Sequence, residues 1–284
     1  MAMNDSQKKR LENVWEALKH DKIAIFSIAF LAIILILSLL APVLPLEPNK
    51  TDVAHMLEAP SSAHIFGTDE VGRDYLARVI YGGRISLLVG VLAMLMSITI
   101  GVTVGILGGI VDSILMRVVD VLQSIPWLIL VTVVSIFFKQ GLVSIVIVIG
   151  FFSWMEIARL VRAEVMSVKE REYVLYADFT GVSLLKMVVR HLIPSVLPTI
   201  IIAATTSISN AIMTESSLSF LGIGIQEPLS SWGKLLQSAQ SNLQNAVYMA
   251  IIPGLLIMLT IFAFNKLGNL LRIYVDPRVM DESK

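Results

Sequence analysis

The 284-residue chain is 56% hydrophobic and 15% charged, and its 22 basic and 22 acidic residues leave no net charge. Soluble globular domains usually carry about 25% charged residues, so this composition excludes an ordinary soluble domain and indicates an integral membrane protein. The chain contains no cysteine, which excludes disulfides and thiol chemistry, and its four histidines are too scattered to predict a metal site.

The chain begins with a basic stretch in which Leu11, Val14, Trp15 and Leu18 recur at helical spacing. We expect residues 1–22 to form an amphipathic helix on the inner membrane face. Six mainly apolar stretches follow, and each is predicted to cross the bilayer, which takes about 20 apolar residues in a helix. They cover residues 23–41, 85–111, 118–138, 141–155, 200–213 and 246–264. The expected fold is therefore all-α with six transmembrane helices.

Some positions within these spans carry further expectations. No small-residue cleavage pattern follows the first span, which is typical of an uncleaved anchor and not of a signal peptide. Gly101 and Gly105 in the second span would let two helices approach closely. Pro126 lies inside the third span, and Pro253 with Gly254 is expected to break the sixth.

A polar segment, residues 44–83, separates the first two spans and contains the run Gly67-Thr68-Asp69-Glu70-Val71-Gly72-Arg73-Asp74. Two glycines that flank acids and an arginine suit a tight turn held by hydrogen bonds from aspartate to arginine or to backbone. We therefore expect a structural role, in preference to substrate contact, for Gly67, Asp69, Gly72, Arg73 and Asp74.

The longest internal polar stretch, residues 166–194, lies between the fourth and fifth spans. Gly181 stands where a helix would end in a left-handed residue, Ser183 can cap a second helix, and Pro194 is expected to close it. The second helix would place one apolar face, made of Leu184, Leu185, Val188, Val189 and Leu192, opposite Lys186 and Arg190. Such a short amphipathic element suits a groove of another protein, although an ordinary connector is the plainer alternative.

Two polar residues stand in or at the end of the fifth span, Asn210 and Glu215. A carboxylate is costly to bury in a membrane, so these side chains either pair within the helix bundle or face a transport path. We take both as candidates for the translocation pathway or its gate.

Six spans place both chain ends on one side of the membrane. Of the 22 basic residues, 16 lie on the side of the termini and the 159–193 loop, against six on the other side. The positive-inside rule therefore predicts that the termini and this loop are cytoplasmic.

The chain lacks a Gly-x-x-x-x-Gly-Lys-Ser/Thr phosphate loop, and no catalytic arrangement stands out. We expect no enzyme activity and no catalytic residue in this chain, so uphill transport would need energy from a partner.

Several of these motifs resemble one protein family. The Gly67–Asp74 run, the 215–224 run Glu-Ser-Ser-Leu-Ser-Phe-Leu-Gly-Ile-Gly with the later Trp232-Gly233, and the ending around Arg272 are similar to the C-type permease subunit of dipeptide, oligopeptide and nickel importers of the ABC class. The spacing of Ala177, Gly181 and Pro194 resembles the EAA loop of such permeases. Leu175 and Tyr176 depart from that pattern, as does Ile273 in the ending.

The resemblance implies a type I ABC importer permease fold with a permease core over residues 84–273, a cytoplasmic coupling loop near 166–194 and a tail at 274–284. Residues 23–83 would hold the first anchor and an extracytoplasmic segment. The loop would dock on an ATPase subunit through Arg171, Glu172, Ala177, Asp178, Gly181 and Pro194.

The implied partners are a related B-type permease, two ATPase subunits that bind ATP and Mg²⁺, and an extracytoplasmic substrate-binding protein, all at a bacterial inner membrane. No nucleic acid and no metal or other cofactor of this chain is expected. The implied cargo is a dipeptide or oligopeptide, with nickel or a metal chelate as the alternative. A secondary transporter that works alone is a third possibility from a different class.

Overall fold

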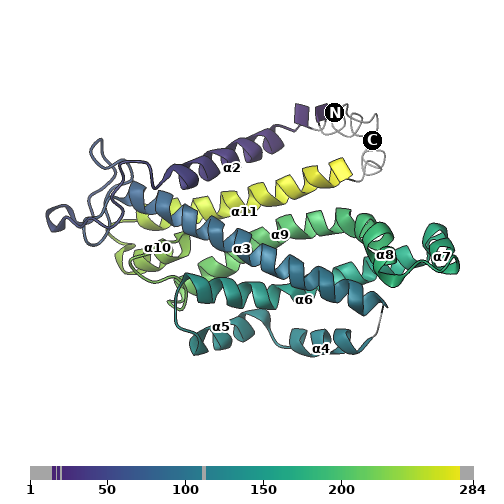
Figure 1. Cartoon of the computed structure of the whole chain (residues 1–284). Coiled ribbons are helices and arrows are strands. Elements are labelled where there is room, and N and C mark those ends of the chain that lie inside the picture. Colours follow the sequence, from purple (N-terminus) through teal and green to yellow (C-terminus); the bar gives the residue numbers. More distant parts are fainter. Residues whose placement is uncertain (1–14, 17, 20, 111–112, 276–284) are drawn as a thin grey trace.

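The computed structural model describes residues 15–16, 18–19, 21–110 and 113–275. Within these ranges all regular elements are helical (Figure 1), which confirms the predicted all-α fold. The long helices are α2 (Lys22–Leu40), α3 (Tyr75–Ile110), α6 (Leu142–Lys169), α9 (Ile193–Phe220) and α11 (Tyr248–Val275). The short ones are α4 (Ser113–Gln123), α5 (Trp127–Phe137), α7 (Glu172–Phe179), α8 (Leu184–Met187) and α10 (Trp232–Ala239). Most of the predicted 1–22 helix and of the 274–284 tail lies outside the described residues.

The helices run lengthwise past one another, so the molecule has two distinct ends (Figure 1). The end that we call the α10 end holds α10 and the segment 41–74, which connects α2 to α3. The opposite end, the α7 end, holds α7, α8, the beginning of α2 and the end of α11. Among the described residues, five helices are long and apolar enough to span a membrane, and the bent pair α4–α5 is a sixth candidate when it is counted as one broken span.

The most extensive helix–helix contact joins α3 to α6. A Cβ atom added at Gly101 would lie 2.7 Å from the Cβ of Ile157, and one added at Gly105 would lie 2.8 Å from the backbone oxygen of Ala158. Real side chains do not approach so closely, so only glycine permits this contact. The expected close approach of helices at Gly101 and Gly105 is confirmed, and α6 is the partner.

The third predicted span is not one continuous helix. The axes of the segments Met116–Gln123 and Trp127–Phe137 differ in direction by 91°. Pro126 immediately precedes α5, where its ring and its missing N–H prevent the helical bonding of α4 from continuing. The sequence placed Pro126 inside the 118–138 span without predicting a bend there, and the bend leaves a space beside α6 and α9.

The fourth span is longer than predicted. Helix α6 continues beyond Met155 to Lys169, because Val161, Val165 and Val168 extend the apolar stripe at helical spacing and are fully buried. The side chains of Glu156 and Arg159 therefore belong to the spanning helix and not to a polar loop.

Three expectations about prolines and caps also need correction. Pro194 does not end the second helix: a π turn, Val188–Leu192, joins α8 directly to α9, and Pro194 occupies the first turn of α9. The π turn immediately before it changes the regular i→i−4 hydrogen-bond pattern, so the helix continues past a proline that lacks an N–H. Helix α11 likewise continues through Pro253 without a break. Ser183 precedes α8 as predicted, but its side chain makes no capping hydrogen bond.

Candidate functional site

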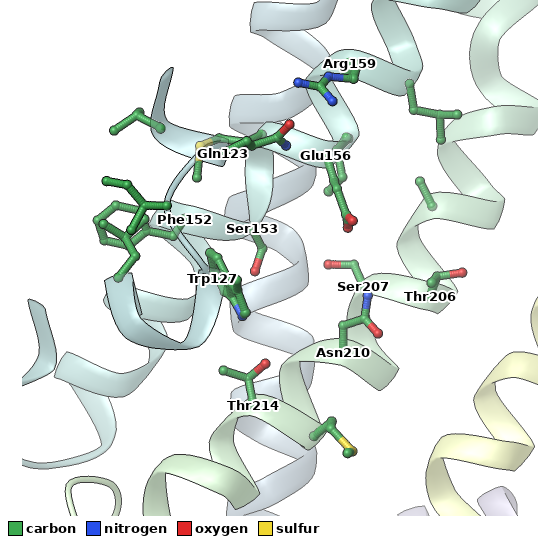
Figure 2. A pocket seen from close by; sticks show the side chains of 18 of the residues that line it. Gln123, Trp127, Phe152, Ser153, Glu156, Arg159, Thr206, Ser207, Asn210 and Thr214 are labelled. Atoms are coloured by element: carbon green, nitrogen blue, oxygen red, sulfur yellow. The ribbon is translucent and has the colours of Figure 1, made fainter. Parts of the chain in front are cut away.

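A cavity of about 960 Å³ lies between the α4–α5 bend, α6 and α9 (Figure 2). Its walls are partly apolar, with Trp127 and Phe152 in edge-to-face contact at 6.3 Å between ring centroids. The polar side chains that line it include Gln123, Ser153, Glu156, Thr206, Asn210 and Thr214. An intramembrane cavity that mixes apolar walls with a few polar groups is suited to hold a solute of drug-like or short-peptide size.

Two charged residues of α6 line this cavity, and their environments differ. Arg159 is paired with Asp120 of α4, with 2.5 Å between the guanidinium nitrogen and the carboxylate oxygen. Glu156 lies one helical turn before Arg159, and its carboxylate points into the cavity (Figure 2). The positive charge on the wall is thus neutralised by a neighbour, while Glu156 remains available to a solute.

The two residues predicted for the pathway lie in different places. Asn210 lines the cavity from α9 (Figure 2). Glu215 does not: its side chain is fully buried inside the bundle, where its carboxylate accepts hydrogen bonds from Ser86 of α3 at 3.2 Å and from Ser219 at 2.7 Å. Glu215 therefore does not line this cavity. Of the two alternatives open in the sequence, it takes pairing within the bundle, because hydroxyl donors offset the cost of its burial.

The predicted docking element consists of α7, the turn at residues 180–183 and α8. Helix α7 ends in a Schellman motif, in which Val182 N–H donates to the Ala177 carbonyl at 3.1 Å and Gly181 N–H donates to the Asp178 carbonyl at 3.0 Å. Gly181 has a φ of +74°, as the left-handed position of this motif requires. The helix–glycine–helix arrangement predicted for this stretch is therefore present.

The inner face of this element is tied to the bundle. Val174 and Ala177 of α7 pack with Met187 and Leu192 in a buried cluster that also holds Val168 at the end of α6. Ala177, one of the predicted docking residues, is buried in this cluster, so its side chain packs α7 against the bundle.

The outer face of the docking element is exposed and strongly apolar. Phe179 is 93% exposed, Leu185 76% and Tyr176 73%. Leu185 and Val189 line a shallow groove of about 530 Å³ together with Ser183, Lys186 and Arg190. The predicted docking residues Arg171, Glu172 and Asp178 are also exposed. An exposed apolar patch with a charged rim at the tip of a projecting element is typical of a protein–protein contact.

The 67–74 run forms a compact turn at the α10 end. Asp69 accepts hydrogen bonds from the backbone N–H of Val71 and Arg73, at 3.0 and 2.9 Å, and from the side chain of Arg73 at 2.6 Å. Gly67 and Gly72 have φ values of +77° and +76°. Asp74 caps α3 by accepting from Ala77 N–H at 2.9 Å. Both kinds of hydrogen bond expected of this run, from arginine and from backbone, are present.

An ion-pair cluster that the sequence motifs did not predict joins this turn to the loop after α9. Glu227 accepts from Arg78 at 2.7 Å and from Arg73 at 3.0 Å, and Arg78 is fully buried. Burial by itself raises the pKa of Glu227, but hydrogen bonding to Arg78 and the charges of both arginines outweigh it and hold that pKa below its ordinary value. The signal in the sequence is only a basic residue, Arg78, in the polar segment that precedes the second span.

Buried hydrogen bonds add to this cluster at the α10 end. The Tyr75 hydroxyl donates to the Met249 carbonyl at 2.6 Å, and the Trp232 ring N–H donates to the Val79 carbonyl at 3.0 Å. We call these contacts, together with the Glu227 ion pairs, the α10-end ties. They connect the start of α3 to α10 and α11.

Among the described residues, no group of three or more His, Cys, Asp or Glu side chains is placed to hold a metal ion. The site features are therefore a cavity with one available carboxylate at its wall and a projecting apolar docking element. Helix α9 connects the two, since Leu184–Phe220 is one helical stretch that runs from the docking element to the cavity wall.

Comparison with known proteins gives consistent matches. The family model described as binding-protein-dependent transport system inner membrane component matches residues 97–281, and that of the N-terminal TM domain of oligopeptide transport permease C matches residues 10–60. The chain is 41% identical to the oligopeptide transport system permease protein OppC of Escherichia coli K12 over 97% of this chain and 95% of that protein. It is 35% identical to the dipeptide transport system permease protein DppC of Bacillus subtilis 168, over 94% and 86%.

The fold is also similar to that of a solved structure, an inward-facing conformation of the MetNI methionine ABC transporter. The TM-score is 0.60 at 18% identity, and the match covers 71% of this chain and 98% of the other. At this level of identity the likeness concerns the fold, which is that of a type I importer permease.

Proposed function

Because the chain belongs to the family of binding-protein-dependent transport system inner membrane components, we propose that it is the permease subunit of an ATP-driven importer and forms half of a pathway for oligopeptides or dipeptides. The cavity beside the α4–α5 bend is its half of that pathway. The peptide cargo rests on the names of the relatives, which favour it over nickel or a metal chelate.

The energy for transport comes from partner subunits. In this proposal two ATPase subunits bind ATP and Mg²⁺, and one of them receives the apolar outer face of α7 and α8. The observation that supports the coupling is the helical stretch Leu184–Phe220, which carries the docking groove at one end and Asn210 in the cavity wall further along. A movement of the ATPase that shifts α8 would therefore also shift one wall of the cavity.

The remaining partners complete the pathway. A related permease closes the open side of the cavity, and a substrate-binding protein delivers the peptide at the α10 end. The α7 end faces the cytoplasm in this arrangement, since 16 of the 22 basic residues are predicted on that side and the ATPases need cytoplasmic ATP. A transporter that works alone has no use for a projecting apolar element, which counts against the third alternative.

The test is to isolate the chain from gently solubilised membranes and to identify its bound partners by mass. We expect a second permease and ATPase subunits with the wild-type chain. Val189→Glu places a charge in the docking groove, and Val53→Glu makes the same change at an exposed valine of the α10 end. We expect Val189→Glu to lose the ATPases and keep the second permease, and Val53→Glu to keep both.

Two results would contradict the proposal. Isolation of the wild-type chain alone, or only with copies of itself, would contradict the proposal that it is a subunit of an importer. Retention of the ATPases by Val189→Glu at the wild-type level would show that α8 is not the docking element.

A further inference from the structure

The cavity has an uneven charge distribution that bears on which peptides can pass. Among the described residues that line it, Glu156 is the only acidic side chain and Arg159 the only basic one. Arg159 is held by Asp120 at 2.5 Å, so this pair contributes no net charge. Within the described part of the chain, Glu156 has neither a hydrogen-bond nor an ion-pair partner. The fixed charge that the cavity presents to a solute is therefore a single negative one.

The wall opposite Glu156 is polar but uncharged. Helix α9 contributes Thr206, Asn210 and Thr214, together with Ser207, whose hydroxyl lies 3.0 Å from that of Ser97. Figure 2 shows the Glu156 carboxylate pointing across the cavity toward this wall. A solute between α6 and α9 would thus meet one carboxylate on one side and neutral hydroxyl and amide groups on the other.

This arrangement favours a cation over an anion. Because the dielectric constant at a cavity wall is lower than in water, a carboxylate there attracts a nearby positive charge more strongly than it would in water. It repels a negative charge for the same reason. The α-amino group of a peptide has a pKa near 8 and is protonated at neutral pH, and it can donate charge-assisted hydrogen bonds to a carboxylate. The terminal carboxylate of the same peptide finds no free cation among the described lining residues, so it has only the neutral groups of α9.

We propose that Glu156 binds the protonated amino terminus of a peptide in transit and makes the cavity selective for peptides with a free α-amine. This inference rests on the proposed function, since it assigns a substrate contact within the proposed pathway. It also predicts that a blocked carboxyl terminus is tolerated, because the described lining residues offer that group no cation other than Arg159, which Asp120 already pairs.

The experiment uses the complete importer, with its partner permease, ATPases and binding protein, reconstituted in proteoliposomes. Uptake of a peptide is compared with uptake of the same peptide acetylated at its amino terminus. The compared variants are Glu156→Gln, which removes the charge at nearly constant shape, and Glu156→Asp, which keeps it. Glu164→Gln is the matched control, since Glu164 lies two turns further along α6 and does not line the cavity.

For each peptide, uptake by a variant is divided by uptake by the wild type. The binding protein is the same in every sample, so its own preference for a free amine cancels in this ratio. We expect Glu156→Gln to lower uptake of the free-amine peptide about three- to tenfold, the range for a partly solvated charged hydrogen bond, and to leave the acetylated peptide unchanged. Glu156→Asp should restore part of the preference, and Glu164→Gln should match the wild type for both peptides.

Two outcomes would overturn the inference while leaving the importer intact. Equal loss of both peptides in Glu156→Gln would show that the carboxylate supports the structure or pairs with the second permease. Unchanged uptake of both would show that it does not contact the peptide. A wild-type complex that hydrolyses ATP but imports neither peptide would instead contradict the proposed peptide transport itself.

Discussion

Replacing Gly181 by valine tests whether the turn between α7 and α8 couples ATP hydrolysis to transport. Gly181 has a φ of +74°, and a Cβ atom added there would meet nothing within 4 Å. The substitution therefore causes no steric overlap, and its cost is the backbone strain of an L-residue in the left-handed region, roughly 1–2 kcal/mol. Since about 1.4 kcal/mol corresponds to a tenfold change in an equilibrium, the native turn should become roughly five- to thirtyfold less favourable.

The strain acts on the part of the element that positions the docking face. The buried cluster of Ala177, Met187 and Leu192 keeps the element attached to the bundle, so the protein should still assemble in the membrane. The direction of α8 relative to α7, however, depends on the Schellman hydrogen bonds around Gly181. We expect the Gly181→Val complex to show several-fold lower peptide-stimulated ATPase activity than the wild type.

The matched control is Gly181→Asn. Asparagine adopts the left-handed conformation more readily than a β-branched residue, so this variant should keep most of the stimulated activity although its side chain is larger than that of glycine. Equal activity of Gly181→Val and the wild type would refute the reasoning. Equal loss in both variants would also refute it, because bulk or polarity, and not backbone strain, would then be the cause.

Three further predictions concern stability, measured as the thermal midpoint of the purified complex in detergent. Glu227→Gln should cost roughly 1 kcal/mol at pH 7 through its weaker bond to Arg78. Because the folded pKa of Glu227 is lowered, the wild-type advantage should shrink as the pH falls through that pKa, and an advantage that is the same at acidic and neutral pH would contradict the ion-pair assignment. Gly105→Val should cost about 1–3 kcal/mol by forcing α3 away from α6, and an unchanged midpoint would show that this contact can relax. Glu215→Leu should cost about 1–3 kcal/mol because Ser86 loses its buried acceptor, whereas a stability equal to wild type would show that water replaces the carboxylate.

Much of the fold could be predicted from the sequence because a membrane leaves few options for a long apolar run. Such a run must be helical to satisfy its backbone, so the number and approximate order of the spans follow from composition alone. The glycine spacing at Gly101 and Gly105 also indicated a tight helix contact correctly. The bend at Pro126 was harder, because Pro194 and Pro253 occur in helices that continue. Whether a proline breaks a spanning helix depends on the helices that pack around it, and the local sequence does not show which helices these are.

The cavity was less predictable than the spans. Asn210 and Glu215 are equally polar and lie near each other in the sequence, yet one lines the cavity and the other is buried. The difference arises from Ser86, a hydrogen-bond partner 129 residues away in the chain. Glu156 was placed in a loop because α6 was expected to end at Met155. Local patterns identify a helix, but they do not show which of its faces meets a distant helix and which lines an opening.

The α10-end ties have a mechanical consequence. They join the first turns of α3 to α10 and α11 by hydrogen bonds and ion pairs that are buried or half-buried, so separating these elements would break several of them at once. At the α7 end, the docking element is exposed over its outer face and is held by an apolar cluster and by a hydrogen bond between the Tyr173 and Ser195 hydroxyls at 2.8 Å. We therefore expect the helices to move relative to one another mainly at the α7 end, with the α10 end acting as the hinge. Amide hydrogen exchange should therefore be slowest around the start of α3 and fastest in α7 and α8.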